Sequence, residues 1–486
     1  MDELGTAEVG ALLGAAGAVL VLIADRRSLL LAGLAALGAA EGLLITATNP
    51  VGAAMVAIGV AGVLLLAAGA AGFVRYPALV TPIVLGVAPF RAPFEFDTEN
   101  RFFVTLAQDG DLGRLLPLYA VLGAASLALA WRSLRGEPVA PLPRPVAIPT
   151  AAFLGFASLS LLWTPSLQVG IDLLAFFLLP FAVLLATVGR APFPAWMPKA
   201  LAAVAVSLAS IFAVAGLIEA TTGRLLFGSP SVDVGNTFRS FFRVTSFFRD
   251  PSIYGRHLVL ALIVVVAALL LSRLDVRLGA VFVALLAAAL FFTYSQSSMV
   301  ALFVAVLFLL IAIAPTRLRV AFAVAAVLLV TVSAVAVASE VQDESTRRAT
   351  SGRSIRIEDA ARVLADKPVA GVGIGGQPAA SRRLADREGG DKAFVSHTTP
   401  LTVGAELGIV GLILYTALLA GAVWAIDQVR RRDRAVGLTL AAALIALFVH
   451  ALAYSGFFED PLTWFVLAVA SSFLVSSAVK DQAVTS

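Results

Sequence analysis

Long apolar segments constrain this chain more than any other feature of its sequence. Blocks of Ala, Val, Leu, Ile and Phe recur along its 486 residues, and a helix of about 20 such residues crosses the roughly 30 Å hydrocarbon core of a bilayer. Only 14% of the residues are charged and 60% are hydrophobic, whereas a soluble domain has about 25% charged residues. The sequence therefore predicts an all-α polytopic membrane protein with about 14–15 transmembrane helices.

The apolar blocks define the individual spans. We expect transmembrane helices at residues 7–24, 29–47, 53–74, 77–91, 114–131, 146–163, 167–188, 199–220, 254–272, 276–294, 297–314, 317–338, 401–426, 436–454 and 460–480. The fourth span has the weakest pattern, because it is short and is interrupted by Pro82 and Pro89.

The basic residues of the short connections predict the orientation of the spans, because such residues stay on the cytoplasmic side. Alternate connections carry them: Arg26/Arg27, Arg75, Arg132/Arg135/Arg144, Arg190/Lys199, Arg273/Arg277, Arg317/Arg319 and Arg430/Arg431/Arg432/Arg434. The connections near 48–52, 163–167, 294–297 and 454–460 contain neither Lys nor Arg. This alternation requires the fourth span, and it predicts an outer N-terminus, a cytoplasmic C-terminus and outer connections at about 92–113, 221–253 and 339–400.

The connections divide the chain into four parts. Residues 1–145 carry the N-terminal helices, 146–338 the central helices with an Arg-rich outer loop at 221–253, 339–400 a long outer loop, and 401–486 the C-terminal helices. Within the long loop, Ser354–Lys367 shows apolar residues at helical spacing and predicts an amphipathic helix that ends at Pro368. A connection of this length is usually functional or disordered.

Composition excludes several kinds of chemistry. The chain has no cysteine, which rules out thiolate nucleophiles, thiolate metal ligands and disulfides. The net charge of +4 is small and its basic residues are scattered, so we expect no nucleic-acid partner. We expect the lipid bilayer itself as a partner and no cofactor.

Ionisable residues inside membrane spans are costly and are therefore functional candidates. In this chain they are Glu41, Asp172, Glu219, Glu406 and His450, each toward the predicted outer end of its span. The skew predicts a cavity open to the outside. The alternative is that each residue simply lies at the headgroup boundary.

The second outer loop is rich in arginine. Its basic residues are Arg224, Arg239, Arg243, Arg249 and, at the start of the next span, Arg256. Positive charge outside needs a reason, and a diphosphate-bearing ligand supplies one because the guanidinium fork matches phosphate oxygens. Phe238, Phe241 and Phe242 have helical spacing and predict an amphipathic helix in the membrane interface, whose alternative role is plain anchoring.

The first and third outer loops hold further candidates. Gly371–Gly376 in the third loop predicts a tight turn packed against the membrane part rather than a nucleotide loop. His397 could take a proton from a sugar hydroxyl, although a single histidine is also often structural. In the first loop, Asp109 and Asp111 could hold a divalent metal or form a solvated turn.

Four stretches resemble one known family. They are Ser160–Ser166; Arg243–Gly255, with Asp250-Pro251 at its centre; Gly352–Gly373, in which Arg353 precedes a helix that ends in Pro-x-x-Gly-x-Gly; and His397–Leu412, with Glu406-x-Gly-x-x-Gly. Together they are similar to the O-antigen ligase and O-antigen polymerase superfamily of bacterial envelope glycan enzymes. The resemblance covers roughly residues 150–475.

The resemblance implies a GT-C-type membrane glycosyltransferase of lipopolysaccharide or other envelope biogenesis, on the outer face of the cytoplasmic (inner) membrane. Its donor would be a glycan linked to undecaprenyl or another polyprenyl diphosphate, its acceptor a glycan, lipid or protein hydroxyl, and it would need no metal. On matching positions, His397 assists the acceptor. The diphosphate-binding candidates are Arg243, Arg353, Arg249, Arg256 and Arg356, with Glu406 and Asp250 in support.

Two departures from the family pattern concern individual contacts. Ser295-Gln296 stands where the family often has Ser-Arg, and Thr398 follows His397 where the family has Asn. Two other functions stay open: a metal-dependent GT-C enzyme with Asp109 and Asp111 as ligands, and a lipid-linked glycan flippase or other transporter.

Overall fold

The computed structural model describes residues 5–48, 53–90, 115–226, 230–238, 240–248, 250–315, 353–384, 398–453 and 459–485. Within these ranges the regular structure is helical. The N-terminal helices are α1 (Thr6–Ile23), α2 (Arg27–Thr48), α3 (Ala53–Arg75), η1 (Pro77–Leu79), α4 (Val80–Val87) and α5 (Leu116–Leu134). Next come α6 (Arg144–Leu159), η2 (Ser160–Trp163), α7 (Leu167–Leu173), η3 (Leu174–Leu178), α8 (Leu179–Val188) and α9 (Met197–Thr222).

The remaining described helices run from α10 to α20. They are α10 (Pro230–Thr237), α11 (Pro251–Leu270), α12 (Val276–Thr293), α13 (Gln296–Ile313), α16 (Arg353–Asp366), α17 (Gln377–Leu384), α18 (Thr399–Arg432), α19 (Arg434–Ala453) and α20 (Pro461–Thr485). Twelve helices of the described ranges are long and apolar enough to cross a membrane. The all-α polytopic membrane fold predicted from the sequence is confirmed.

The predicted fourth span is helical but short. It forms η1 and α4, which bend by 115° from the end of α3 at Tyr76. With a rise of about 1.5 Å per residue, α4 alone cannot cross the hydrocarbon core. The predicted span at 317–338 and the outer connection at 92–113 lie outside the described residues.

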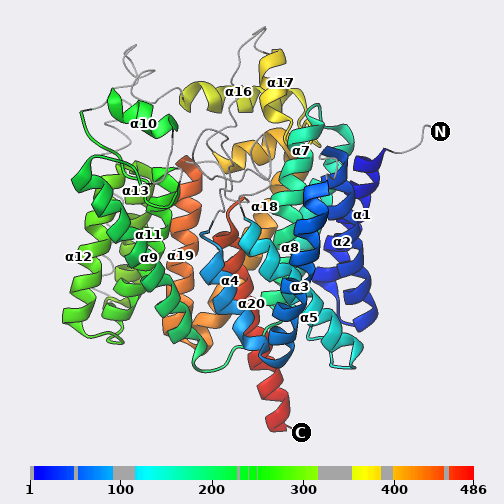
Figure 1. Cartoon of the computed structure of the whole chain (residues 1–486), viewed down its shortest axis with the longest axis horizontal. Coiled ribbons are helices and arrows are strands. Elements are labelled where there is room, and N and C mark those ends of the chain that lie inside the picture. Colours follow the sequence, from blue (N-terminus) through cyan, green and yellow to red (C-terminus); the bar gives the residue numbers. More distant parts are fainter. Residues whose placement is uncertain are drawn as a thin grey trace.

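The helices pack around two buried apolar clusters. One joins α1, α2, α5, α6, α8, α18 and α20. The other joins α9, α11, α12, α13 and α19, which stand on the left of Figure 1. α19 contributes to both clusters, with Leu438 in one and Leu447 in the other, so it lies at the junction of the two halves.

The bundle has two distinct ends. α10, α16 and α17 lie at the upper end in Figure 1, where α1 also begins, and the chain ends at the opposite side. We call the end that carries α10, α16 and α17 the loop end. The amphipathic helix predicted at Ser354–Lys367 is present as α16 (Arg353–Asp366). Its residues Ala360 and Val363 pack on Ala380 of α17 and Ala405 of α18.

Arg190 is buried at the end opposite the loop end, where it links α1, α8 and the connection before α6. Arg190 donates from Nε to the carbonyl of Ala140, from Nη1 to Ala186 and from Nη2 to Ala24, at 3.1–3.2 Å. Ala186 and Ala24 lie at the C-terminal ends of α8 and α1, where carbonyl groups lack helical partners. Burial lowers the pKa of Arg190 to about 10, so it keeps its charge at neutral pH.

Candidate functional site

The N-terminal ends of four helices meet at the loop end. α11 contacts α13 where Ser298 Oγ donates to the carbonyl of Ser252 at 3.4 Å, and Gly255 leaves room for Ser298. α18 meets the end of α19 because Thr398 and Thr399 donate to the carbonyls of Leu452 and Ala451, at 3.2 and 3.3 Å. α20 joins them through the ion pair described next.

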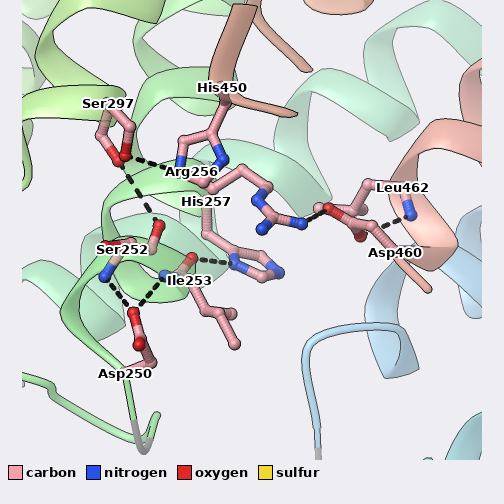
Figure 2. Close-up of polar contacts among 10 residues, drawn as sticks. Asp250, Ser252, Ile253, Arg256, His257, Ser297, His450, Asp460 and Leu462 are labelled. Atoms are coloured by element: carbon pink, nitrogen blue, oxygen red, sulfur yellow. Dashed lines mark hydrogen bonds and ion pairs between the residues drawn. The ribbon is translucent and has the colours of Figure 1, made fainter. Parts of the chain in front are cut away.

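A polar cluster lies where these helices meet, formed by Arg256, Ser297, His450 and Asp460 (Figure 2). His450 Nε2 is 3.3 Å from Ser297 Oγ, and Arg256 forms an ion pair with Asp460. All four side chains are buried. A narrow crevice beside the cluster is lined by Arg256, Val259, Leu260, Ala301, Ala446, Leu447 and His450.

The Arg256–Asp460 pair has little contact with solvent. Arg256 is 8% exposed and Asp460 is 5% exposed. Burial by itself raises the pKa of Asp460, but the charge and hydrogen bond of Arg256 outweigh it and hold that pKa below its ordinary value. Asp460 Oδ1 also accepts the backbone N–H of Leu462 at 2.9 Å and so caps α20. The carboxylate therefore ties the start of α20 to α11.

Asp250 has the same capping role on α11. Its Oδ1 accepts the backbone N–H groups of Ser252 and Ile253, at 2.6 and 3.3 Å, and Pro251 occupies the first helical position. His257 of the same helix stacks on Phe248, with ring centroids 4.7 Å apart. These contacts join the start of α11 to the loop before it.

We call residues 240–248 the Arg243 loop. The side-chain amide of Asn236 donates to the Arg243 carbonyl at 3.0 Å, and the Arg243 N–H donates back to Asn236 Oδ1 at 2.9 Å. The Arg243 guanidinium is oriented by its Nε, which donates to the carbonyl of Thr293 at 3.0 Å. The backbone and the side chain of Arg243 are therefore each held by a specific contact.

The amphipathic helix predicted at Phe238, Phe241 and Phe242 is not formed. α10 ends at Thr237, and residues 240–248 have no regular helix. The Asn236–Arg243 pairing closes the chain into a turn, which is incompatible with a helix running through these positions. Phe238 is 85% exposed, and Phe241 instead packs on Tyr294 with centroids 4.3 Å apart.

The glycine cluster forms the tight turn predicted from its sequence. The N–H groups of Val372 and Gly373 donate to the carbonyls of Ala405 and Glu406, at 3.1 and 2.8 Å. α18 admits this contact because its helical conformation breaks at Gly408, with φ of 65°. A Cβ at Gly371 would lie 2.3 Å from the Glu406 backbone, so only glycine fits there.

The side chain of Glu406 also binds this turn. Its carboxylate accepts backbone N–H groups of Gly375 and Gln377, and the residue is 7% exposed. On the far side of the turn, the Ile374 N–H donates to Ser160 Oγ at 3.0 Å and Thr164 Oγ1 donates to the Ile374 carbonyl at 2.8 Å. The turn thus joins α18 to the end of α6.

The structure describes only some of the remaining predicted site residues. His397, Arg249, Asp109 and Asp111 lie outside the described residues. Arg353 and Arg356 belong to the first turn of α16 rather than preceding it. Thr398, the neighbour of His397 in sequence, is held against the end of α19 two residues beyond His450.

Three of the five ionisable residues predicted to line an outward-open cavity are buried in the described part of the structure. Glu219, Glu406 and His450 are at most 7% exposed, and they bind three different places: the Arg243 loop, the glycine turn and Ser297. The sequence pattern did not show that backbone N–H groups and a neighbouring hydroxyl form hydrogen bonds with these side chains.

Comparison with known proteins gives one result for the family. Residues 281–416 match the family model described as O-antigen ligase, a segment that runs from α12 through α13, α16 and α17 into α18. No curated protein matches the chain. The match supports a membrane-embedded glycan ligase or polymerase in general terms, and it supports the place of this chain in the O-antigen ligase and O-antigen polymerase superfamily.

Proposed function

We propose that this protein is a GT-C-type glycosyltransferase that transfers or polymerises a polyprenyl diphosphate-linked glycan onto an acceptor hydroxyl, without a metal. The observation that carries the proposal is the O-antigen ligase match at residues 281–416. That segment contributes α13, α16 and the start of α18 to the loop end, where the held arginine of the Arg243 loop also lies.

Arg243 is the proposed main ligand of the donor diphosphate, supported by Arg249, Arg353 and Arg356. A guanidinium whose backbone and Nε are already held loses little further freedom when it binds phosphate. Arg256 can reach a diphosphate only by loosening its ion pair with Asp460. We therefore give Arg256 a secondary part in diphosphate binding.

His397 is the proposed acceptor-side base. In the reaction, the acceptor oxygen forms a bond to the anomeric carbon while the bond from that carbon to the diphosphate oxygen breaks. The acceptor proton passes to His397, and polyprenyl diphosphate leaves with the electron pair, inverting the anomeric configuration. The arginines act on the charge that develops on the leaving diphosphate, where fixed donors lower the barrier most.

Glu406 and Asp250 are proposed as supporting residues. Glu406 holds the glycine turn between α16 and α18, and Asp250 fixes the start of α11. Both act by shaping the backbone that carries the arginines and His397.

The protein is proposed to lie in the cytoplasmic (inner) membrane with the loop end facing the periplasm or exterior. Basic residues of the opposite end support this orientation, because Arg190, Arg277 and Arg430 follow the cytoplasmic preference of such residues. Polyprenyl diphosphate-linked glycans would then enter from the outer leaflet.

The test is an assay of purified protein in proteoliposomes with a polyprenyl diphosphate oligosaccharide as donor, with and without EDTA. Glycan transfer that survives EDTA supports the proposal, and the product distinguishes ligase from polymerase. Transfer abolished by EDTA and restored by a divalent metal would favour the metal-dependent enzyme. Donor movement across the bilayer without a new glycan bond would favour a transporter.

A further inference from the structure

Glu219 lies in the last full turn of α9, at the loop end, and is completely buried. Its Oε1 accepts the N–H of Leu226 at 2.9 Å, and its Oε2 accepts the N–H groups of Thr245 and Ser246, at 2.8 and 2.7 Å. A buried carboxylate is costly unless it is paired or strongly hydrogen bonded. Three backbone donors meet that requirement, and two of them belong to the Arg243 loop.

α9 presents one continuous face to this loop. Phe212, Gly216 and Glu219 are spaced at i, i+4 and i+7, which places them on one side of a helix. The carbonyl of Phe212 accepts Ser246 Oγ at 2.8 Å and Tyr254 Oη at 3.0 Å. A Cβ at Gly216 would lie 2.3 Å from Tyr254 Oη, so the glycine allows the close approach.

Ser246 has a backbone conformation that serine rarely adopts, with φ of 53°. Such a conformation persists where surrounding contacts enforce it. Here the N–H of Ser246 is bound by Glu219 and its hydroxyl by Phe212. The Glu219 carboxylate therefore helps to enforce the turn that follows Arg243.

Arg243 is fixed from both sides by these contacts. Asn236 pairs with its backbone on one side, and Glu219 binds Thr245 and Ser246 on the other. The Val244 N–H also donates to the Phe292 carbonyl at 3.2 Å. The loop is thus ordered by contacts made within the protein itself.

We propose that Glu219 is a positioning residue, which holds Arg243 in the conformation that binds the diphosphate of the lipid-linked donor. This inference rests on the proposed function and adds a residue to it. Glu219 itself does not touch the donor, because all of its described contacts are to backbone N–H groups. It acts by lowering the ordering cost of the loop when the donor binds.

The isosteric variant Glu219→Gln tests the role. Its amide offers one oxygen, so at least one of the three backbone N–H groups faces an NH2 group and loses its acceptor. The expected result is a rise in the donor KM on the order of tenfold, with a much smaller change in kcat. Asp233→Asn is the matched control, since it removes an exposed carboxylate from α10 near the same loop and leaves the donor KM unchanged.

A double-variant comparison separates positioning from general destabilisation. Binding of farnesyl diphosphate, a short soluble probe of the head group, is measured for wild type, Glu219→Gln, Arg243→Ala and the double variant. The role predicts that Glu219→Gln weakens binding in the wild-type background and has almost no further effect when Arg243 is absent. Equal weakening in both backgrounds, or wild-type affinity in Glu219→Gln, overturns it.

Hydrogen exchange of the wild-type protein provides a measurement that does not depend on a variant folding. The amides of Thr245 and Ser246 are expected to be protected before the probe is added. Rapid exchange of both amides that slows only with the probe overturns the inference. A wild-type protein that neither binds the probe nor transfers glycan contradicts the proposed function as well, whereas normal wild-type binding with an unaffected Glu219→Gln contradicts the role of Glu219 alone.

Discussion

Arg256 of α11 and Asp460 at the start of α20 form a buried ion pair between positions 204 residues apart in the sequence. The pair links the green half of the bundle in Figure 1 to the C-terminal helix. His450 lies beside it and contacts Ser297 of α13. These two contacts hold α11 to α20 and α13 to α19 at the loop end.

Breaking this pair is expected to destabilise the protein strongly. In Asp460→Asn, the Arg256 charge stays buried without its carboxylate, a change that costs about 3–5 kcal/mol. Thermal or denaturant unfolding in detergent measures the loss. Asp427→Asn is the control, because Asp427 pairs with exposed Arg430 and Arg431 at the opposite end and its removal changes stability little. Similar unfolding of the two variants would contradict the importance of the buried pair.

The same pair predicts how stability depends on pH. The folded pKa of Asp460 is below its ordinary value, so its contribution is complete above the unfolded pKa of about 3.9 and is lost as pH falls through the folded value. The difference in unfolding free energy between wild type and Asp460→Asn should stay constant from about pH 7 to pH 5 and shrink only below about pH 4. A difference that already disappears between pH 7 and pH 5 would show that Asp460 is not held in its charged form.

The glycine turn should tolerate no side chain at Gly371. Gly371→Ala combines a φ of 67° with a Cβ that overlaps the Glu406 backbone, and it should cost about 3 kcal/mol or more. Gly136→Ala separates the two causes, since Gly136 also has a positive φ but nothing within 4 Å of its Cβ; it should cost about 1 kcal/mol. Comparison of unfolding midpoints tests this order, and a Gly371→Ala protein as stable as Gly136→Ala would argue against the tight packing on α18.

Arg243 should matter through both its charge and its geometry. Arg243→Ala is expected to raise the donor KM more than Arg243→Lys, because lysine keeps a positive charge but cannot form the paired phosphate contact. Lysine also lacks the Nε that donates to Thr293. The exposed Arg224 is the control, and Arg224→Ala should leave KM nearly unchanged. Donor kinetics equal to wild type in both Arg243 variants would remove Arg243 from the site.

Much of the architecture follows from the sequence because apolar length alone decides which segments can cross a bilayer. The helices from Thr6–Ile23 to Pro461–Thr485 match the predicted spans closely wherever the structure describes them. The weak fourth span begins after the break before Pro77, as predicted, but its helix ends at Val87 and is therefore shorter than predicted. Proline fixes φ and lacks an N–H, so a pattern interrupted by proline predicts a helix boundary poorly.

The candidate site was only partly predictable. The arginine-rich loop and the glycine cluster identified in the sequence both lie at the loop end of the structure. Pairing between distant residues, however, leaves no local pattern in the sequence. Asp460 and Asn236 were missed for this reason. Asp460 had one available signal, since Asp-Pro at the start of an apolar block marks a helix N-cap, as Asp250-Pro251 does on α11. The helix predicted from the Phe238–Phe242 spacing was wrong, because the side chain of Asn236 pairs with the backbone of Arg243 and closes a turn there.

A stoichiometric assay of bond formation in proteoliposomes tests the proposed glycosyltransferase activity most directly. Labelled polyprenyl diphosphate oligosaccharide is supplied with acceptor, and both the new glycan product and the released polyprenyl diphosphate are counted for wild type and for His397→Ala. The wild type is expected to release one polyprenyl diphosphate for each glycosidic bond that it forms. A correctly inserted His397→Ala protein is expected to give neither product. Equal product from the variant would contradict the role of His397, and a wild-type protein that releases no polyprenyl diphosphate while it binds or moves the donor would contradict the glycosyltransferase itself.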